Sequence, residues 1–411
     1  MSSYSYNLSN IIGFNALVDA DENNSNILKL YKVECKTTNS LYNIIRYDKD
    51  VLNVDVIPTY GLCRSVIINN KKQVVSFAPP KSLYADTFMK QYKQWGSSIE
   101  AQEFVEGTMI NLFFDDSIGE VGSWEIATRN NVGANNIFFK TDNMKSFRKL
   151  FMEAAIECNL DINSLDRQLC YSFVLQHPEN RIVVPFKTPQ LYLVAVYHIL
   201  NELNNVRVEF RDVYNYKEYF QEIGSTVKFP QIYQGMDYTE LINKYCSMNT
   251  SYDIQGVVLY NKETGERSKI RNPVYEQVKH LRGNQPKLQY QYLSLRRQGK
   301  VKDYLKYYPE NKKEFSKFRD QVHLFTNTLY SNYKSCYIQK EKPLNQYPKQ
   351  YSSNMYYLHQ HYMNNLRENK LHINNTIVQN YVNNLQPSVL MYCLNYDMRK
   401  QTIDTMVSDN S

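Results

Sequence analysis

Apolar and β-branched residues alternate with polar ones, or form short apolar runs, through the first two thirds of the chain. Runs of this kind, bounded by Gly, Pro, Asn or Asp, predict strands, and the short polar segments between them predict hairpin turns. Strands are expected over residues 51–58, 64–68, 73–77, 98–104, 109–114, 123–128, 172–175, 182–184, 191–200, 253–260 and 268–271. The pattern therefore indicates antiparallel sheets.

Helical spacing dominates elsewhere. A helix is expected over residues 143–158, where apolar side chains recur three or four positions apart, and a helical region begins at residues 273–281. From residue 288 onward the strand signals fade and apolar residues recur with a period of about 3.6. Prolines spaced through this region would end helices, so about five are expected. The fold class is predicted as α+β, an antiparallel-sheet domain followed by an all-helical C-terminal domain.

The length of the chain predicts more than one domain, because 411 residues exceed what a single compact core usually holds. The change from strand to helix signals places the boundary between residues 284 and 285. The sheet domain would then span residues 1–284, with a small N-terminal subdomain over about residues 1–50. Residues 285–411 would form a helical accessory domain.

Charge is unevenly distributed along the chain. The net charge is +7, and residues 285–411 carry 18 Lys and Arg against 9 Asp and Glu, which is +9 and leaves −2 for residues 1–284. A basic appendage is typical of a polyanion-binding domain, and RNA or another nucleic acid is the expected partner. The candidate contacts are Arg296, Arg297, Lys300, Lys302, Lys312 and Lys313. The alternative is a solvated helical surface.

Tyrosines stand among these basic residues at Tyr304, Tyr307 and Tyr308. Such rings either stack on exposed bases or fill the interfaces between helices. The sequence leaves both roles open.

Cysteine usage indicates a reducing, intracellular compartment. The seven cysteines are scattered and odd in number, and no Cys-x-x-Cys pair suggests a zinc ribbon. No secretory signal opens the chain, and the apolar run at residues 191–200 is too short to span a bilayer, so no membrane association is expected. His359 and His361 suggest a metal site only if they lie on a strand or loop; the flanking pattern predicts a helix, so no metal site is expected.

Five segments in order carry the candidate chemistry. They are residues 63–66 (CRSV), 103–108 (EFVEGT), 173–183 (FVLQHPENRIV), 254–259 (IQGVVL) and 269–273 (KIRNP). They resemble the motifs of phage-type ATP-dependent RNA ligases, which belong to the nucleotidyltransferase family: Arg-Gly-x-x, Lys-x-Asp/Glu-Gly, Phe-Glu-x-x-x-Pro-x-Asn-Arg-Ile-Val, Glu-Gly-Val-Val and Lys-x-Lys. The resemblance covers roughly residues 50–285 and extends to relatives in large DNA viruses. It implies a nucleotidyltransferase fold for the first domain.

The resemblance also implies what is missing. In the family, the lysine of the second motif attacks the α-phosphate of a nucleotide, and here that position holds Phe104. Val174 and Gln255 stand where the family carries glutamates, one of which is associated with metal. A phenyl ring cannot attack phosphorus, and two lost carboxylates weaken any metal site. Three losses together favour a protein that has kept the frame of an enzyme without its nucleophile.

The remaining motif residues are expected to bind nucleotide. They are Arg64, Glu106, Gly107, Arg129, Lys269 and Arg271, none of them assigned a catalytic or metal-binding role. The leading interpretation is a noncatalytic RNA-ligase homologue that binds nucleotide, RNA or both, and a larger protein complex is a further candidate partner. One alternative is an active ligase, requiring ATP and Mg²⁺, whose nucleophilic lysine is displaced to Lys81, Lys90 or Lys93. The other is a scaffold that has lost its ligand. A viral protein of this kind would act in the host cytoplasm, a viral factory or the virion.

Overall fold

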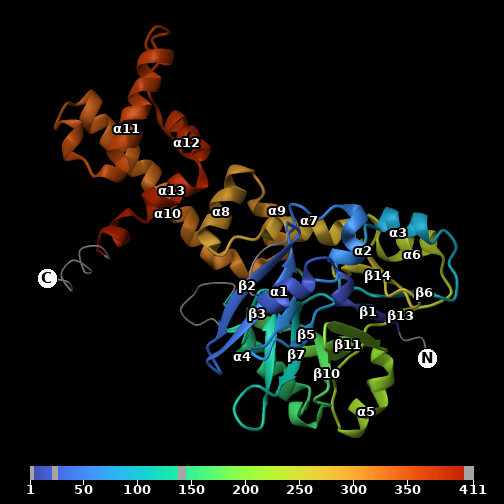
Figure 1. The fold of residues 1–411 in the computed structure, drawn as a ribbon. Coiled ribbons are helices and arrows are strands. Elements are labelled where there is room, and N and C mark those ends of the chain that lie inside the picture. The colour runs from blue at the N-terminus through green and yellow to red at the C-terminus, as the bar shows by residue number, and fades with distance from the viewer. Residues whose placement is uncertain (1–3, 21–25, 138–144, 402–411) are drawn as a thin grey trace. The chain divides into compact units, whose positions relative to one another are not determined.

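The structure, a computed structural model, describes residues 4–20, 26–137 and 145–401. The chain divides into two compact units (Figure 1). Unit 1 spans Met1–Lys279 and unit 2 spans His280–Ser411. The fold class predicted from the sequence is confirmed: antiparallel sheets with helices come first, and a helical region follows.

Three sheets make up the strand content of the described part of unit 1. The largest has the strand order β1-β12-β11-β10-β7-β8-β9, and two four-stranded sheets have the orders β13-β6-β14-β15 and β2-β3-β4-β5. The strands are β1 (Ser5–Asn7), β2 (Leu28–Cys35), β3 (Ser40–Tyr47), β4 (Val66–Ile68), β5 (Val74–Phe77), β6 (Ile99–Glu103), β7 (Thr108–Asp115), β8 (Ser123–Thr128), β9 (Asn131–Val132), β10 (Leu169–Gln176), β11 (Gln190–Glu202), β12 (Asn205–Arg211), β13 (Ile232–Tyr233), β14 (Gly256–Asn261) and β15 (Arg267–Arg271). All of these neighbours pair antiparallel.

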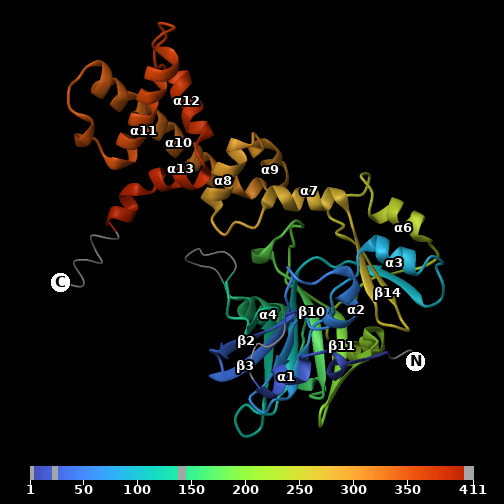
Figure 2. The same ribbon diagram turned by 45° about the horizontal axis from the view of Figure 1, so that its top comes forward.

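Helices cover these sheets. They are α1 (Phe14–Ala20), α2 (Ile57–Tyr60), α3 (Ala85–Gln91), α4 (Phe147–Glu157), α5 (Lys217–Glu222), α6 (Tyr238–Tyr245) and α7 (Pro273–Arg282). The helix expected over residues 143–158 is α4; residues 143 and 144 lie outside the described residues. Ser146 caps it by accepting a hydrogen bond from the backbone N–H of Lys149. Its apolar face packs with the central strands β7, β10 and β11 in one core cluster (Figure 2).

Two predicted strands are wrong. Instead of a strand, residues 51–58 contain a short 3₁₀ segment, Val54–Val56, which is followed by α2. This segment forms because the Asn53 side chain accepts hydrogen bonds from the backbone N–H groups of Asp55 and Val56. Residues 182–184 form no strand either, because the backbone N–H groups of Val183 and Val184 donate to the Glu106 carboxylate. Strand β10 pairs instead with β11 and β7.

Strands β2 and β3 were not expected from the sequence. Strand β3 pairs with β4, so residues 28–47 share one sheet with residues 66–77. Alternate positions of both strands are buried, with Leu28, Leu30 and Ile45 in one core cluster. The alternation is interrupted, because Tyr31 and Lys32 of β2 are both exposed and Ile44 and Ile45 of β3 are both buried, and this interruption weakens the period-2 signal.

Unit 2 contains helices and no strand among its described residues. The α-helices are α8 (Leu288–Arg297), α9 (Val301–Tyr307), α10 (Lys312–Tyr333), α11 (Lys349–His361), α12 (Asn375–Asn384) and α13 (Pro387–Leu394). A π-helical turn continues α10, η7 (Lys334–Ile338), and another continues α11, η9 (Tyr362–Leu366). In the parts of the chain that the structure describes, no helix has the length and apolar character that crossing a membrane requires.

Two of the tyrosines considered as base-stacking residues are part of the core of unit 2. Tyr304 and Tyr308 are buried and stack on each other with ring centroids 4.7 Å apart. Tyr304 also stacks on the buried Phe315, at 5.0 Å. These two rings fill a helix interface and are not accessible to nucleobases, so the stacking role is wrong for them.

Candidate functional site

A cavity of about 240 Å³ lies within unit 1, between the large sheet and the small sheet that contains β6, β14 and β15. Each of the five motif segments contributes at least one residue to its lining: Arg64, then Phe104 and Gly107, then Val174, then Gln255, then Lys269. These residues are spread over 206 positions of the chain. The fold therefore brings the five separate motifs to one place.

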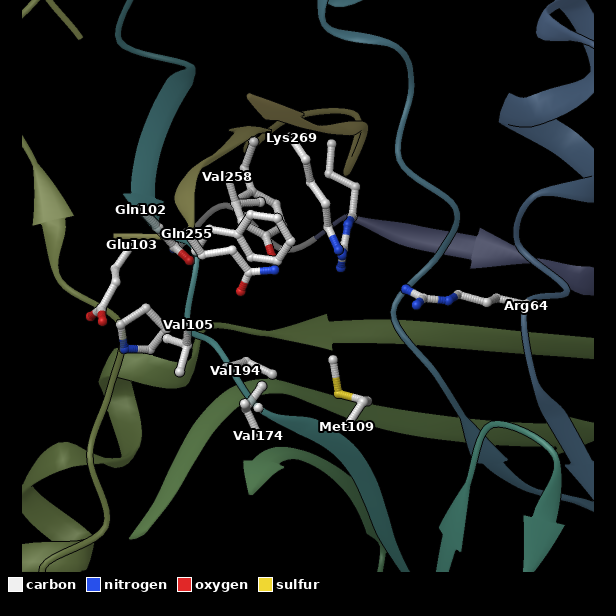
Figure 3. A pocket seen from close by; sticks show the side chains of 15 residues that line it. Arg64, Gln102, Glu103, Val105, Met109, Val174, Val194, Gln255, Val258 and Lys269 are labelled. Atoms are coloured by element: carbon white, nitrogen blue, oxygen red, sulfur yellow. The ribbon is translucent and has the colours of Figure 1, made fainter. Parts of the chain in front are cut away.

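One side of the cavity is apolar. Met109 on β7, Val174 on β10 and Val194 on β11 form it, and Figure 3 shows these three side chains together on the large sheet. The three positions where the motif resemblance implies replaced residues, Phe104, Val174 and Gln255, all line this same cavity. The side-chain oxygen of Gln255 is buried and has no hydrogen-bond partner among the described residues. That oxygen is an open acceptor at the cavity wall.

The segment of residues 104–107 crosses from the small sheet to the large one. The backbone N–H of Phe104 donates to the carbonyl of Gly256 at 3.2 Å, and the side-chain amide of Gln176 donates to the carbonyl of Glu106 at 2.9 Å. Gly107 has φ of +149°, and a Cβ there would lie 2.4 Å from the carbonyl oxygen of Leu175. Only glycine fits, because any other side chain would collide with β10.

Glu106 points away from the cavity. Its carboxylate accepts hydrogen bonds from the backbone N–H groups of Val183, at 2.7 Å, and Val184, at 3.1 Å. It is 5% exposed, and burial raises the pKa of this carboxyl to about 7 against the lowering effect of the two hydrogen bonds. Expected as a nucleotide contact, Glu106 instead holds the segment after β10 in place.

The opposite wall of the cavity is cationic. Arg64, which precedes β4, and Arg267 and Lys269, both on β15, line it. Figure 3 shows Lys269 and Arg64 extending toward the same space. The Lys269 ammonium lies 4.4 Å from the ring centroid of Phe104. Among the described residues, none of these three cations forms an ion pair, so their charges are left for an anion to neutralise.

The mutual repulsion of these cations is visible in their pKa values. Burial, then Arg267 and Arg64, lower the pKa of Lys269 well below its usual range. Burial and the charge of Arg267 lower the pKa of Arg64 to about 10. The pKa of Lys81 is lowered by burial and by the neighbouring Arg64 and Arg271. An anion entering the cavity would relieve this repulsion, so the charged state of the wall favours anion binding.

Besides Glu106, two further predicted nucleotide contacts do not line the cavity. Arg129, after β8, lies with its guanidinium 5.4 Å from the ring centroid of Tyr47, and its buried Nε has no hydrogen-bond partner in the described chain. Its charge still acts on Arg64 and Lys81. Arg271 is exposed and forms an ion pair with Glu276 at 2.8 Å. Glu125 forms no ion pair with either arginine, because its carboxylate contacts Arg148.

Arg267 is the site residue that the sequence reasoning missed. It was placed in the turn before β15, but it is the first residue of that strand and is 5% exposed. Its Nε donates a hydrogen bond to the Ser82 hydroxyl at 3.3 Å, and this bond holds the guanidinium within the cationic wall. The signal was available: Arg267 precedes Lys269 by two residues, the spacing that places side chains on one face of a strand.

The lysines proposed as displaced nucleophiles lie elsewhere. None of Lys81, Lys90 and Lys93 lines the cavity, although Lys81 borders a neighbouring pocket that shares Arg267. Lys269 does line the cavity, and its ammonium lies 4.4 Å from the ring centroid of Phe104.

The cavity offers little to a divalent metal. Of its lining residues only Glu103 is a carboxylate; its Oε2 accepts a hydrogen bond from the backbone of Gln231, and burial raises its pKa. Within the described residues, no group of three His, Cys, Asp or Glu side chains is placed to hold a metal ion. Hard cations such as Mg²⁺ need several oxygen ligands, so the residues present do not fit a protein-held metal.

The basic residues predicted to contact nucleic acid lie on the first helices of unit 2. Arg296 and Arg297 end α8, Lys300 precedes α9, and Lys312 and Lys313 begin α10. Lys302, Lys312 and Lys313 are exposed, whereas Arg297 donates to the side chain of Gln386 at 2.6 Å. Their role as phosphate contacts stays a prediction.

All seven cysteines lie in the described chain and are unpaired. His359 and His361 lie on α11, as the apolar pattern predicted, and the ring of His359 stacks on Tyr337.

Comparison with known proteins gives one sequence relative and several similar structures. The chain is 25% identical over 207 residues to an RNA ligase of Rhodothermus phage RM378, covering 44% of this chain and 45% of that protein. The chain thus spans less than half the length of this relative. No protein-family model matches.

Two of the similar structures are forms of Naegleria gruberi RNA ligase. A variant with ATP and Mn has a TM-score of 0.35 at 10% identity, covering 51% of this chain and 60% of that one. The form with PPi has a TM-score of 0.34 at 10% identity, covering 49% and 57%. The sequence similarity to the phage enzyme agrees with the motif resemblance, and the chain is RNA-ligase-like.

Proposed function

We propose that unit 1 binds a nucleotide, or the phosphorylated end of an RNA, without becoming covalently nucleotidylated at the position of Phe104. The observation that carries this proposal is the single cavity lined by all five motifs, with the cations retained and the nucleophile and carboxylates replaced. The RNA-ligase relationship supports a nucleotide or RNA as the ligand. The chemistry of the cavity supports an anion.

The physical argument rests on the three unpaired cations of the wall. Burying a cation without a partner is costly, and the chain maintains Arg64, Arg267 and Lys269 together in a partly desolvated space. A phosphate group offers several acceptor oxygens and negative charge, which suits a fork-shaped guanidinium and a lysine. The apolar side formed by Met109 and Val174 would accommodate a base or sugar.

The test of binding is calorimetric titration of the full chain with ATP, GTP and AMP. Binding should weaken at least about tenfold in the Lys269→Ala and Arg267→Ala variants, since a hydrogen bond to a charged group contributes about 1.5–3 kcal/mol. Lys90→Ala is a matched control that removes a lysine outside the cavity. If the unmodified protein binds neither nucleotide nor a 5′-phosphorylated oligonucleotide, the proposal fails and the scaffold interpretation takes its place.

A second candidate function is supported by Lys269. Its ammonium lies beside Phe104, and its lowered pKa favours the neutral amine that nucleophilic attack requires. In an active ligase, this amine would attack the α-phosphorus of a nucleoside triphosphate. The N–P bond would form as the bond to pyrophosphate breaks, and the amine would lose a proton to solvent.

Intact-mass measurement separates the two candidates. After incubation with ATP or GTP and either Mg²⁺ or Mn²⁺, the noncatalytic proposal expects the mass of the apoprotein. A gain of one nucleoside monophosphate, mapped to Lys269 and absent in Lys269→Arg, would establish the displaced nucleophile instead.

A further inference from the structure

An open groove of about 690 Å³ lies in unit 2, beside α11. Residues of the segment before the helix form one side, and the outer face of α11 forms the other. Two adjacent tyrosines on the helix, Tyr356 and Tyr357, are 48% and 61% exposed. Their ring centroids are 5.8 Å apart with an interplanar angle of 70°. The groove therefore presents two aromatic faces to solvent.

The core of unit 2 does not need these two rings. Met355 and Leu358 on the same helix are fully buried and anchor α11, whereas Tyr356 and Tyr357 lie on the side turned away from them. Each tyrosine carries a large apolar ring, and about half of Tyr356 and more than half of Tyr357 are open to solvent. Two neighbouring exposed rings in a groove are therefore the kind of surface that a ligand covers.

The charge around the groove is positive. Residues 334–372 hold six Lys and Arg against two Asp and Glu, a net charge of +4. Lys349 is exposed and lies one helical turn before Ser352 and two turns before Tyr356, so all three share one face of α11. Lys342 directly precedes Pro343 at the other side of the groove. Glu341 is engaged with the Ser335 hydroxyl.

A column of stacked rings lies in the same region. The rings of Tyr337 and His359 are parallel within 9° and 3.9 Å apart, Tyr362 follows His359 at 5.8 Å, and His372 follows Tyr362 at 6.4 Å. Tyr337 and Tyr362 belong to the π-helical turns η7 and η9. Such turns are rare and frequently mark functional sites. The column ends at His372, which is exposed.

We propose that the groove beside α11, with Tyr356, Tyr357 and Lys349, is a binding site for single-stranded nucleic acid. Unstacked bases would lie on the two tyrosines, and the phosphates would approach Lys349 and Lys342. This combination of accessible aromatic faces and a basic surround is what binding of a single strand requires, because every base has a π-face and every phosphate a charge. A duplex hides its bases, so it would use the lysines alone.

This site is separate from the cavity of unit 1 and does not depend on it. It also differs from the basic residues 296–313 singled out by the sequence, because the tyrosines buried there cannot stack. The two proposals fail independently: mononucleotide binding reports on the cavity, and binding of an oligonucleotide without a terminal phosphate reports on the groove.

The test measures anisotropy of a labelled oligouridylate of about ten nucleotides, a length within the usual site sizes, added to the full chain. The variant Tyr356→Ala with Tyr357→Ala should lose at least about fivefold in affinity, since each stacked base contributes roughly 1–3 kcal/mol. The matched double Phe variant should bind as tightly as the unmodified protein, because the aromatic faces are retained. Oligothymidylate in a parallel titration distinguishes RNA from DNA as the strand.

A second experiment tests the proposed contacts between the lysines and the phosphate groups. Removing Lys349 and Lys342 together should reduce the salt dependence by about 1.4 in log–log slope, which is roughly 0.7 for each lost contact on a single strand. Three results would overturn the proposal: no binding of single strands at low salt, equal affinity for the double Ala and unmodified proteins, or an unchanged preference for single strands over duplex in the double Ala variant. A folded state of each variant is checked by thermal unfolding.

Discussion

At the scale of the residue, the chemistry of the cavity is limited by a phenyl ring. Phe104 stands where the motif resemblance places a nucleophilic lysine, and Lys269 lies 4.4 Å from its ring centroid, with no carboxylate at positions 174 and 255. A cation over an aromatic face is attracted by the ring quadrupole. The phenyl ring cannot act as a nucleophile, and it attracts the neighbouring ammonium without neutralising its charge.

Restoring the amine alone should not restore ligation. In Phe104→Lys a second ammonium would be placed beside Lys269, and Glu103 alone among the lining residues would offer a carboxylate, which is too few oxygen ligands to position a metal. The triple variant Phe104→Lys, Val174→Glu, Gln255→Glu supplies all three groups and is the fair comparison. A gel-based assay with a 5′-phosphorylated RNA, ATP and Mg²⁺ measures the ligation activity of the single and the triple variant. Efficient ligation by the single variant would show that the lost carboxylates are not what prevents the reaction.

Anion binding should be accompanied by proton uptake. Burial and neighbouring cations lower the pKa of Lys269, and a bound phosphate would raise it again by stabilising the ammonium. At a pH between the free and bound values, the amine therefore gains a proton on binding. Calorimetry in two buffers of different ionisation enthalpy measures this uptake. The Lys269→Met variant should bind more weakly and take up fewer protons; equal uptake in both would assign the proton to another group.

The stability contribution of Glu106 should decrease as pH rises. Its folded pKa of about 7 lies above the ordinary value of 4.5, so the folded state binds the proton more tightly than the unfolded state. The contribution is fully present below pH 4.5 and is lost as pH rises through 7, by at most about 3 kcal/mol. Thermal unfolding of Glu106→Gln and the unmodified protein from pH 4.5 to 8 measures the difference. A constant difference across that range would contradict the raised pKa.

At the scale of the element, the crossing between two sheets shapes the site. Strand β6 ends at Glu103 and β7 begins at Thr108, and the four residues between them carry the chain from the small sheet to the large one. Hydrogen bonds to Gly256 and from Gln176 fix both ends of this crossing. The arrangement depends on the close approach of Gly107 to β10.

Gly107→Ala should therefore destabilise unit 1 by about 2–4 kcal/mol, through a strained φ and a collision with backbone. The added Cβ would lie 2.4 Å from the carbonyl oxygen of Leu175, which cannot move without shifting β10. Gly96→Ala is the matched control, because a Cβ there meets nothing within 4 Å. Chemical denaturation compares the two variants. Equal stabilities would mean that the crossing relaxes at little cost.

At the scale of the whole molecule, the uneven distribution of charge predicts that the chain binds nucleic acid. The salt dependence of this binding should grow with the number of phosphates contacted. Residues 285–411 carry +9 and the remainder −2. Affinity of the full chain for single strands should fall steeply with salt, by roughly 0.7 in log–log slope per contact. Replacing Lys302, Lys312 and Lys313 by Gln should lower that slope if these exposed residues contact phosphate. An unchanged slope would leave them as a solvated surface and assign the contacts to the groove beside α11.

Much of the architecture could be predicted from local patterns. Most strands of unit 1 and the helical character of unit 2 follow from side-chain periodicity, since each element must bury one face. The prediction of a strand at residues 51–58 was wrong because the Asn53 side chain caps a helical turn. An apolar pattern does not reveal such a local hydrogen bond. The strand predicted at residues 182–184 was wrong because the N–H groups of Val183 and Val184 donate to the carboxylate of Glu106, which lies 77 positions before Val183.

For the candidate site, the sequence by itself determined which chemical groups are present. Phe104 cannot act as a nucleophile in any fold, and the absence of a carboxylate at Val174 and Gln255 is equally independent of structure. Only the tertiary structure decided which groups meet, because that depends on contacts between strands far apart in the chain. It joined Arg267 to Arg64 and Lys269, turned Glu106 toward Val183, and buried Tyr304 while leaving Tyr356 exposed. Side-chain identity is local, whereas burial and charge pairing are properties of the folded packing.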